Sequence, residues 1–253
     1  MKDGFRIVDE DKTYKLNMVK GVFNVNVRDY YVFLRLYSEI FKNQEHQQDE
    51  GFYSSEGLII DIGACEGYYI IALASNSQNN CKIIAFEPNP FAFKTLEKNI
   101  ISNRLSKIVR AEQFAISDNN SDTAEFVYVE GVNNIGALSN SNSRSSWLDS
   151  DYSSKMQVRT IRMDEYLKKE NINEIDILKI DAEGSEFKVL NSFGDFIKNI
   201  NKIVVECHSA EDKISITEYL SKNGFKIIKE CEDDNPNFTY LGNIYFRKLI
   251  TNS

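Results

Sequence analysis

The stretch that decides the fold is residues 58–67, which read Leu-Ile-Ile-Asp-Ile-Gly-Ala-Cys-Glu-Gly. An apolar strand runs here into a turn with Gly63 and Gly67, and both glycines allow positive φ and a close approach of the backbone to a ligand. The segment 66–75 is expected to open a helix whose free N–H groups face the same crevice. Strand, turn and helix together predict a ligand site at the start of a βαβ unit.

The next apolar run, residues 82–86, ends in Glu87, twenty positions after Gly67. An acid at this strand end is where a doubly wound sheet hydrogen-bonds a ribose, so the ligand is expected to be a nucleoside. A dinucleotide fingerprint requires a central glycine, but position 65 is Cys, and a Gly-Lys-Ser/Thr phosphate loop is absent. The spacing instead is typical of sites for S-adenosylmethionine (SAM), which carries an ammonium and a sulfonium but no phosphate.

Composition agrees with one large α/β domain. The chain has 253 residues, 42% of them hydrophobic, which is enough to bury a single core. A net charge of −8 disfavours a nucleic-acid partner. The four cysteines form no C-x-x-C pair, so neither a zinc site nor a disulfide framework is indicated. Signal-peptide features and membrane-span lengths are absent, so we expect a cytoplasmic protein without a membrane partner.

Residues 1–57 are the least regular part of the chain. Short strands are expected near 14–16 and 23–27, and apolar residues at helical spacing predict an amphipathic helix over 29–47. We therefore expect this segment to form an N-terminal cap on the domain that follows.

From residue 58 to residue 253, strand-like and helix-like segments alternate. This alternation predicts an α/β fold with a mostly parallel seven-stranded sheet whose last strand is antiparallel. Residues 117–162 interrupt it with hairpin-like strands and a polar stretch, 133–151, rich in Ser and Asn. We expect this insertion to lie on the ligand side, with the polar stretch as a mobile lid rather than part of the core.

A second dense motif, residues 177–186, reads Ile-Leu-Lys-Ile-Asp-Ala-Glu-Gly-Ser-Glu. Ligands of open α/β sheets bind outside the carboxyl ends of the strands, so Asp181 and Glu183 are expected to face the same crevice as the glycine turn. The following strand ends in Glu206 and His208. Two neighbouring strand ends therefore bring acids and an imidazole together.

These groups suit the removal of a proton from a bound acceptor that becomes a nucleophile only when it is deprotonated. His208, with an ordinary pKa of about 6.5, is the predicted general base. Asp181 and Glu206 are expected to orient it, to bind the acceptor or to hold the ammonium of SAM. Two alternatives stay open: His208 as a hydrogen-bonded structural residue, and the acids as ligands of a divalent cation. The cation is not favoured, because these carboxylates can equally meet the substrate or pair with Lys179 and Arg162.

Taken together, several motifs in this sequence resemble those of one protein family. They are residues 61–67, Glu87-Pro88, residues 114–118, Thr160 with Asp164-Glu165-Tyr166, Lys179-Ile180-Asp181-x-Glu183-Gly184-x-Glu186, and Glu206-x-His208. In this form they look like the FkbM family of SAM-dependent methyltransferases, over about residues 58–208. The resemblance implies a class I methyltransferase fold and O-methylation of a hydroxyl on a sugar, a polyketide or a related small metabolite. Family members usually carry Asn at position 65, where this chain has Cys.

The turn and the resemblance together imply a set of SAM contacts. They are Asp61, Gly63, Ala64, Gly67, Glu87, Pro88, Phe91, Ala115 and Asp181. The alternatives are a nucleic-acid or protein methyltransferase and a non-catalytic SAM-binding partner protein. The Asn/Asp-Pro-Pro-aromatic and Pro-Cys motifs of nucleic-acid methyltransferases do not occur in the chain. The acceptor and the oligomeric state have no signature in the sequence.

Overall fold

The computed structural model describes residues 6–7, 13–18, 21–27, 57–76, 81–129, 132–141, 146–149, 151–231 and 242–249. Seven strands form its main sheet. They are β4 (Leu58–Ile62), β5 (Lys82–Phe86), β6 (Val109–Glu112), β11 (Ile175–Ile180), β12 (Ile200–Cys207), β13 (Phe225–Cys231) and β14 (Gly242–Lys248). The helices beside it are α2 (Tyr68–Asn76), α3 (Pro90–Ser102), α4 (Met163–Lys169), α5 (Glu186–Asn191) and α6 (Ala210–Lys222).

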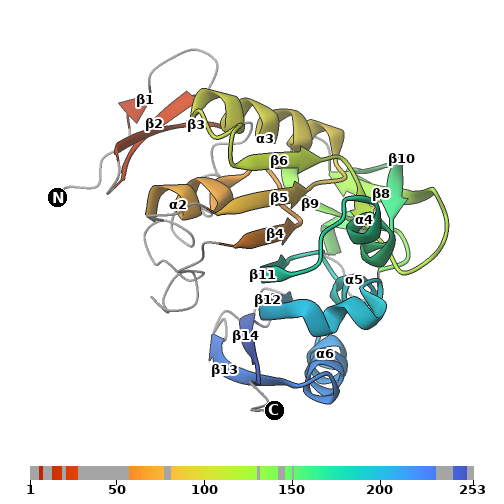
Figure 1. The fold of residues 1–253 in the computed structure, drawn as a ribbon. Coiled ribbons are helices and arrows are strands. Elements are labelled where there is room, and N and C mark those ends of the chain that lie inside the picture. The colour runs from red at the N-terminus through yellow and green to blue at the C-terminus, as the bar shows by residue number, and fades with distance from the viewer. Residues whose placement is uncertain are drawn as a thin grey trace.

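The strand order is β13-β14-β12-β11-β4-β5-β6 (Figure 1). Only β14 is antiparallel to its neighbours, β12 and β13. The predicted doubly wound sheet with an antiparallel last strand is therefore confirmed. The crevice outside the carboxyl ends of β4 and β11 is the place where the chain reverses its winding direction, which is where such sheets bind ligands.

Alternating apolar residues build a core on each face of the sheet. Ile59, Ile83 and Ile177 pack with α2 and α3, whereas their neighbours in sequence face α4, α5 and α6. Strands buried on both faces read as continuous apolar runs, as residues 83–86 of β5 do. The segment after β11 is not one continuous helix: α5 is followed by the 3-10 turn η3 (Gly194–Asn199), because Gly194 has a φ of 52° that an α-helix does not accommodate.

A small N-terminal sheet lies beside α3 (Figure 1). It consists of β1 (Arg6–Ile7), β2 (Thr13–Met18) and β3 (Gly21–Asn26), so both predicted short strands are confirmed. Tyr14, Leu16 and Val25 are buried in the same cluster as α2 and α3. The expected helix over 29–47 lies outside the described residues.

Asn99 on α3 ties β3 to the glycine turn. Its Oδ1 accepts hydrogen bonds from the backbone N–H and the side-chain amide of Asn26, at 2.7 and 2.9 Å. Its Nδ2 donates to the carbonyl oxygens of Asn26 and Glu66, at 3.2 and 2.8 Å. One buried amide thus satisfies backbone groups of two segments that lie far apart in the sequence.

We expect Asn99→Ala to destabilise the protein by about 1–3 kcal/mol, because it leaves buried polar partners unsatisfied. The measurement is the free energy of unfolding from urea denaturation. Lys98→Ala is the matched control, since Lys98 is the exposed neighbour on the same helix. An Asn99→Ala protein as stable as this control would show that the bonds contribute nothing net.

The insertion forms a second sheet. Its strands are β7 (Ala115–Ile116), β8 (Thr123–Val129), β9 (Val132–Leu138) and β10 (Ser153–Ile161), in the order β7-β10-β8-β9. The expectation that 133–151 has no part in a core is wrong at Ala137, Leu138 and Leu148, which are buried in apolar clusters. The physical reason is pairing: β9 lies antiparallel on β8, and this places its last residues against apolar neighbours.

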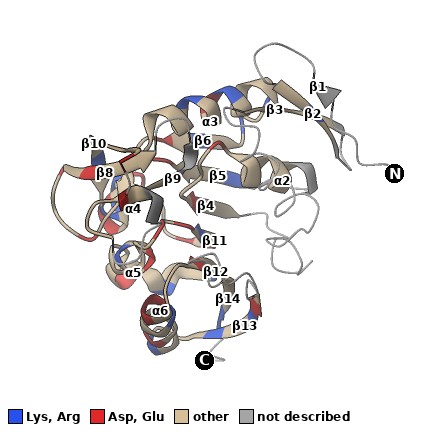
Figure 2. Cartoon of the chain, turned by 180° about the vertical axis from the view of Figure 1, so that it is seen from behind, with Lys and Arg blue, Asp and Glu red and all other residues tan. Residues whose placement is uncertain are grey.

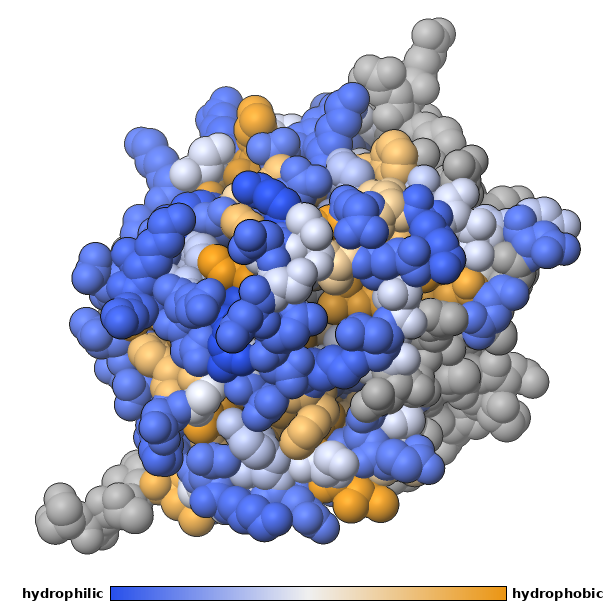
Figure 3. All heavy atoms as spheres, turned by 90° about the vertical axis from the view of Figure 1, so that its right-hand side faces the viewer, coloured by the Kyte–Doolittle hydropathy of each residue, from blue (hydrophilic) through white to orange (hydrophobic). Residues whose placement is uncertain are grey.

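The surface is polar over most of the face seen in Figure 3, where apolar residues form small, separate patches. Acidic and basic residues are mixed on α4 and α6 (Figure 2). Of the helices among the described residues, none combines the length and apolarity that crossing a bilayer requires.

Candidate active site

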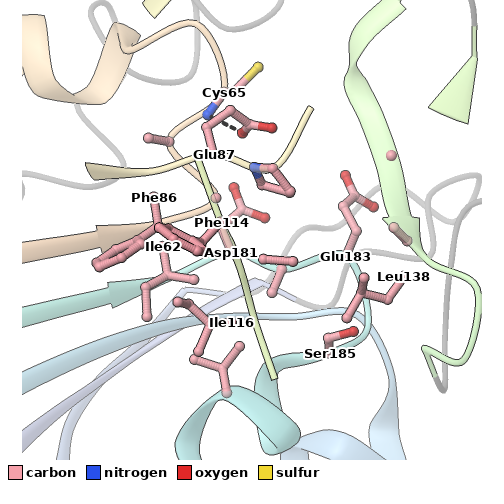
Figure 4. Close-up of a pocket in the computed structure, with 18 of the residues that line it drawn as sticks. Ile62, Cys65, Phe86, Glu87, Phe114, Ile116, Leu138, Asp181, Glu183 and Ser185 are labelled. Atoms are coloured by element: carbon pink, nitrogen blue, oxygen red, sulfur yellow. Dashed lines mark hydrogen bonds between the residues drawn. The ribbon is translucent and has the colours of Figure 1, made fainter. Parts of the chain in front are cut away.

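A pocket opens where the prediction places the ligand, at the carboxyl ends of β4, β5, β11 and β12 (Figure 4). One side is formed by the glycine turn, the end of β5 and the turn after β11. The opposite side comes from the insertion sheet. The residues of the main-sheet side that bear on function are Gly63, Ala64, Cys65, Glu87, Pro88, Lys179, Asp181, Glu183, Ser185 and Glu206. Phe114 also lines the pocket, together with Ala115 and Ile116 on β7 of the second sheet.

The glycine turn wraps closely around the ends of β5 and β11. Gly63 has a φ of 82°, and the N–H groups of Gly63 and Ala64 both donate to the carbonyl oxygen of Phe86 at 3.0 Å. A Cβ on Gly63 would lie 1.7 Å from the carbonyl oxygen of Asp181. No side chain fits there, so glycine at position 63 is a steric requirement of this fold.

Glu87 braces the same turn from the end of β5. Its Oε2 accepts a hydrogen bond from the N–H of Cys65 at 2.8 Å (Figure 4). Its Oε1 accepts one from the N–H of Asn89 at 2.7 Å. Burial raises the pKa of Glu87 to about 8, although both N–H donors oppose the shift. The carboxyl group lines the pocket, where the second-strand acid of a nucleoside site is expected.

We expect Glu87→Ala to weaken SAM binding by about 1.5–3 kcal/mol, the range for hydrogen bonds to a charged group. The loss combines a ribose contact with the brace on Cys65. Isothermal titration calorimetry measures it, with Glu112→Ala as the control, since Glu112 ends the neighbouring strand β6 outside the pocket wall. Equal affinities of the two variants would contradict the assignment.

Asp61 does not lie where a direct contact with SAM would place it. It is fully buried and does not line the pocket; its Oδ1 lies 3.4 Å from Nζ of Lys179, the residue opposite it on β11. Lys179 also lies 3.5 Å from Oδ2 of Asp181 and 5.3 Å from the ring centroid of Tyr69. Burial raises the pKa of Asp61, with Lys179 opposing it. Lys179 thus stands between Asp61 and the ligand space.

His208 is held by a residue that the sequence analysis did not single out, Glu186. Glu186 is fully buried at the start of α5, and its Oε1 accepts the N–H groups of Ala182 and Gly184 at 3.1 and 3.0 Å. The same oxygen lies 2.9 Å from Nδ1 of His208, which donates because a carboxylate only accepts. The other ring nitrogen, Nε2, therefore turns toward Glu183 and Glu206, at 3.7 and 3.8 Å.

The charges of this cluster are strongly coupled. Burial lowers the pKa of His208, but Glu186, Glu183 and Glu206 outweigh it and hold that pKa well above its ordinary value. Burial and Asp181 raise the pKa of Glu206, with the His208 ring opposing them. Both shifts favour the protonated forms of Glu206 and His208.

The other predicted residues fall into two groups. Pro88 and Ala115 line the pocket, together with Phe114 and Ile116. Gly67, Phe91 and His208 do not line it: Gly67 packs toward Leu96, and Phe91 is 42% exposed, with its ring 5.7 Å from that of Tyr128. An adenine stack on Phe91 therefore has no support in this arrangement.

The sequence does not predict which residues form the far wall of the pocket. It consists of Phe126 on β8 and Gly136, Ala137 and Leu138 on β9. Their only signal in the sequence is the hairpin-like pattern of the insertion, which does not tell which face meets the ligand. The sequence indicates Lys179 only as an ion-pair partner. Its place on the pocket wall follows from the register of β11 on β4.

Comparison with known proteins agrees with this geometry. Residues 61–227 match the family described as the methyltransferase FkbM domain. The chain belongs to the FkbM methyltransferase family. The match begins at the glycine turn and includes the turn after β11 and the end of β12. The family and the fold are those of a SAM-dependent methyltransferase.

Two curated relatives show the range of this family. The hexuronic acid methyltransferase AglP of Haloferax volcanii is 25% identical over 167 residues, which are 66% of this chain and 62% of that protein. The chain thus spans less than two thirds of AglP. The 31-O-demethyl-FK506 methyltransferase FkbM of Streptomyces tacrolimicus is 23% identical over 217 residues, 77% of this chain and 82% of that protein.

A solved structure supports the fold alone. A Clostridium thermocellum protein assigned as an rRNA methylase superposes with a TM-score of 0.50 at 12% identity, covering 82% of this chain and 95% of that one. The class I methyltransferase architecture is therefore shared well beyond the FkbM family.

Proposed function

We propose that this FkbM-family methyltransferase transfers the methyl group of SAM to a hydroxyl of a sugar, a polyketide or a related small metabolite. The observation that supports this best is the juxtaposition of two half-sites. The glycine turn and Glu87 form a nucleoside cradle, and an acid and imidazole cluster lies beside it at the next two strand ends. We call the second half-site the acid–histidine cluster and define it as Asp181, Glu183, Glu206 and His208.

Methyl transfer from a sulfonium is an in-line displacement. The acceptor oxygen must approach the methyl carbon opposite the sulfur, and its proton must leave. In our proposal the methionine half of SAM lies along Gly63, Ala64 and Cys65. The acceptor oxygen then lies over the acid–histidine cluster, which receives the proton. We assign His208 as the base, oriented by Glu186 through Nδ1, with Asp181 beside it to bind the acceptor.

The pocket chemistry favours a small metabolite over nucleic acid. The charged groups on the acceptor side are carboxylates. Lys179, the one ammonium that the described residues place on the wall, is already paired with Asp61 and Asp181. Phosphate contacts call for free basic groups. The opposite wall is apolar, with Phe126 and Leu138, and suits the carbon skeleton of a sugar ring or a polyketide.

The test combines binding with product analysis. Calorimetry with SAM should give one site per chain. Turnover with methyl-deuterated SAM, over a panel of neutral glycosides, hexuronides and hydroxylated macrolides, should yield S-adenosylhomocysteine and a product labelled on oxygen. A label on nitrogen or carbon would overturn O-methylation, whereas the absence of SAM binding would overturn the cofactor assignment.

A further inference from the structure

Three side chains of the acid–histidine cluster converge in a way that proton transfer alone does not require. Asp181, Glu206 and His208 each offer a ligand atom, and these atoms all lie within 4.8 Å of one another. Mg²⁺ binds oxygen ligands at about 2.0–2.1 Å, so two ligands of one such ion lie at most about 4.2 Å apart. The three atoms therefore need to approach one another by about half an ångström to bind a single ion.

We propose that Asp181, Glu206 and Nε2 of His208 bind one divalent cation of the Mg²⁺ or Mn²⁺ kind. The inference rests on the proposed function only in one respect, that the acceptor hydroxyl would complete the coordination. Carboxylate oxygens suit Mg²⁺ and Mn²⁺, and an imidazole ligand is also accepted by first-row metals.

The position of Glu186 outside this triad supports the assignment. A histidine that binds a metal almost always donates its second ring N–H to a carboxylate, which fixes the ring and its tautomer. Glu186 makes this bond to Nδ1 at 2.9 Å and is itself held by the N–H groups of Ala182 and Gly184. Nε2 is thereby directed toward Glu206 and Glu183, at distances beyond a direct hydrogen bond.

Buried negative charge supplies the second, independent observation. Glu186 is fully buried, and its Oε2 has no hydrogen-bond partner among the described residues. A buried carboxylate in this state is costly unless positive charge lies close by. The His208 ring, 2.9 Å from Oε1 of Glu186, supplies that charge when it is protonated, and a cation bound to Nε2 would supply it when the ring is neutral.

The burial gradient fits an open metal site. The side chains of Asp181 and Glu206 are 28% and 20% exposed and line the pocket, whereas Glu186 behind them is closed off. Catalytic metal sites keep coordination positions open toward the substrate. With the ion bound, Nε2 gives its lone pair to the metal. Such an ion would lower the pKa of an acceptor hydroxyl, Glu183 would be placed to accept the proton, and the oxygen's electron pair would displace the sulfur of SAM from the methyl carbon.

The experiment needs neither SAM nor an acceptor. Full-length protein is treated with EDTA, desalted and titrated with MnCl₂ while electron paramagnetic resonance follows free Mn²⁺. We expect one saturable site per chain that Mg²⁺ competes for. Asp181→Asn, Glu206→Gln and His208→Gln should each weaken Mn²⁺ binding at least about tenfold, and Glu186→Gln by roughly 10–100-fold. Asp176→Asn, at the other end of β11, should leave it unchanged.

The outcomes separate this inference from the proposed function. Absence of saturable Mn²⁺ binding, or binding that none of the triad substitutions weakens, overturns the metal site. Full methyl transfer in EDTA also overturns it and leaves O-methylation standing. Mn²⁺ binding that follows the triad in a protein that methylates nitrogen or carbon supports the site and refutes the proposed acceptor chemistry.

Discussion

Gly63→Ala is expected to abolish SAM binding and to lower the yield of folded protein, although it adds a single methyl group. The added Cβ would lie 1.7 Å from the carbonyl oxygen of Asp181, a backbone atom that cannot move without shifting the end of β11. The turn carrying Cys65 would be displaced with it. Calorimetry with SAM and circular dichroism measure the two effects.

Gly224→Ala provides the matched control. Gly224 has a φ of 85°, close to that of Gly63, but a Cβ there meets no atom within 4 Å. The control therefore carries only the strain of an L-residue in the left-handed region, about 1–2 kcal/mol. If both variants bound SAM equally well, the close approach of Gly63 to Asp181 would have no role in the cofactor site.

His208→Ala should lower kcat by roughly 10²–10⁴-fold, the usual loss when a group that handles the reacting proton is removed. SAM affinity should stay within about twofold, because His208 lies behind the carboxylates and off the pocket wall. The expectation holds whether His208 takes the proton itself or acts through a bound ion. Single-turnover kinetics separates the chemical step from binding.

Glu211→Ser is the control for His208→Ala, because Glu211 is an exposed residue on the next helix, α6. An equal loss of SAM affinity in His208→Ala would move His208 into the cofactor pocket. Turnover close to that of the control would make it a structural residue at the end of β12.

The cofactor half of the site was largely predictable from the sequence. An apolar run, two spaced glycines and a strand-end acid fix Gly63 and Glu87 through local geometry alone. Asp181 and Glu206 followed from the rule that the carboxyl ends of parallel strands meet at one edge of the sheet. These inferences need no knowledge of which side chains touch.

The remaining features depend on contacts between distant segments. Lys179 lies opposite Asp61 through the register of β11 on β4, which sequence patterns leave undetermined. Glu186 reads as an ordinary acid in the first turn of a helix, where the helix dipole favours it. Its burial and its bond to His208, 22 residues away, appear only in three dimensions. Phe91 shows the opposite case. Its place in the sequence predicts a contact with SAM, but the folded chain puts it outside the pocket.

The division of the pocket between two sheets has an evolutionary consequence. In the proposed function the donor molecule is held by the central sheet, where Gly63 has no room for a side chain, whereas the far wall is carried by the β8–β9 hairpin of a separate sheet. Phe126 and Leu138 can change size without moving Gly63 or Glu87. Selection for a new acceptor can therefore act on one hairpin while the chemistry of the donor is inherited intact.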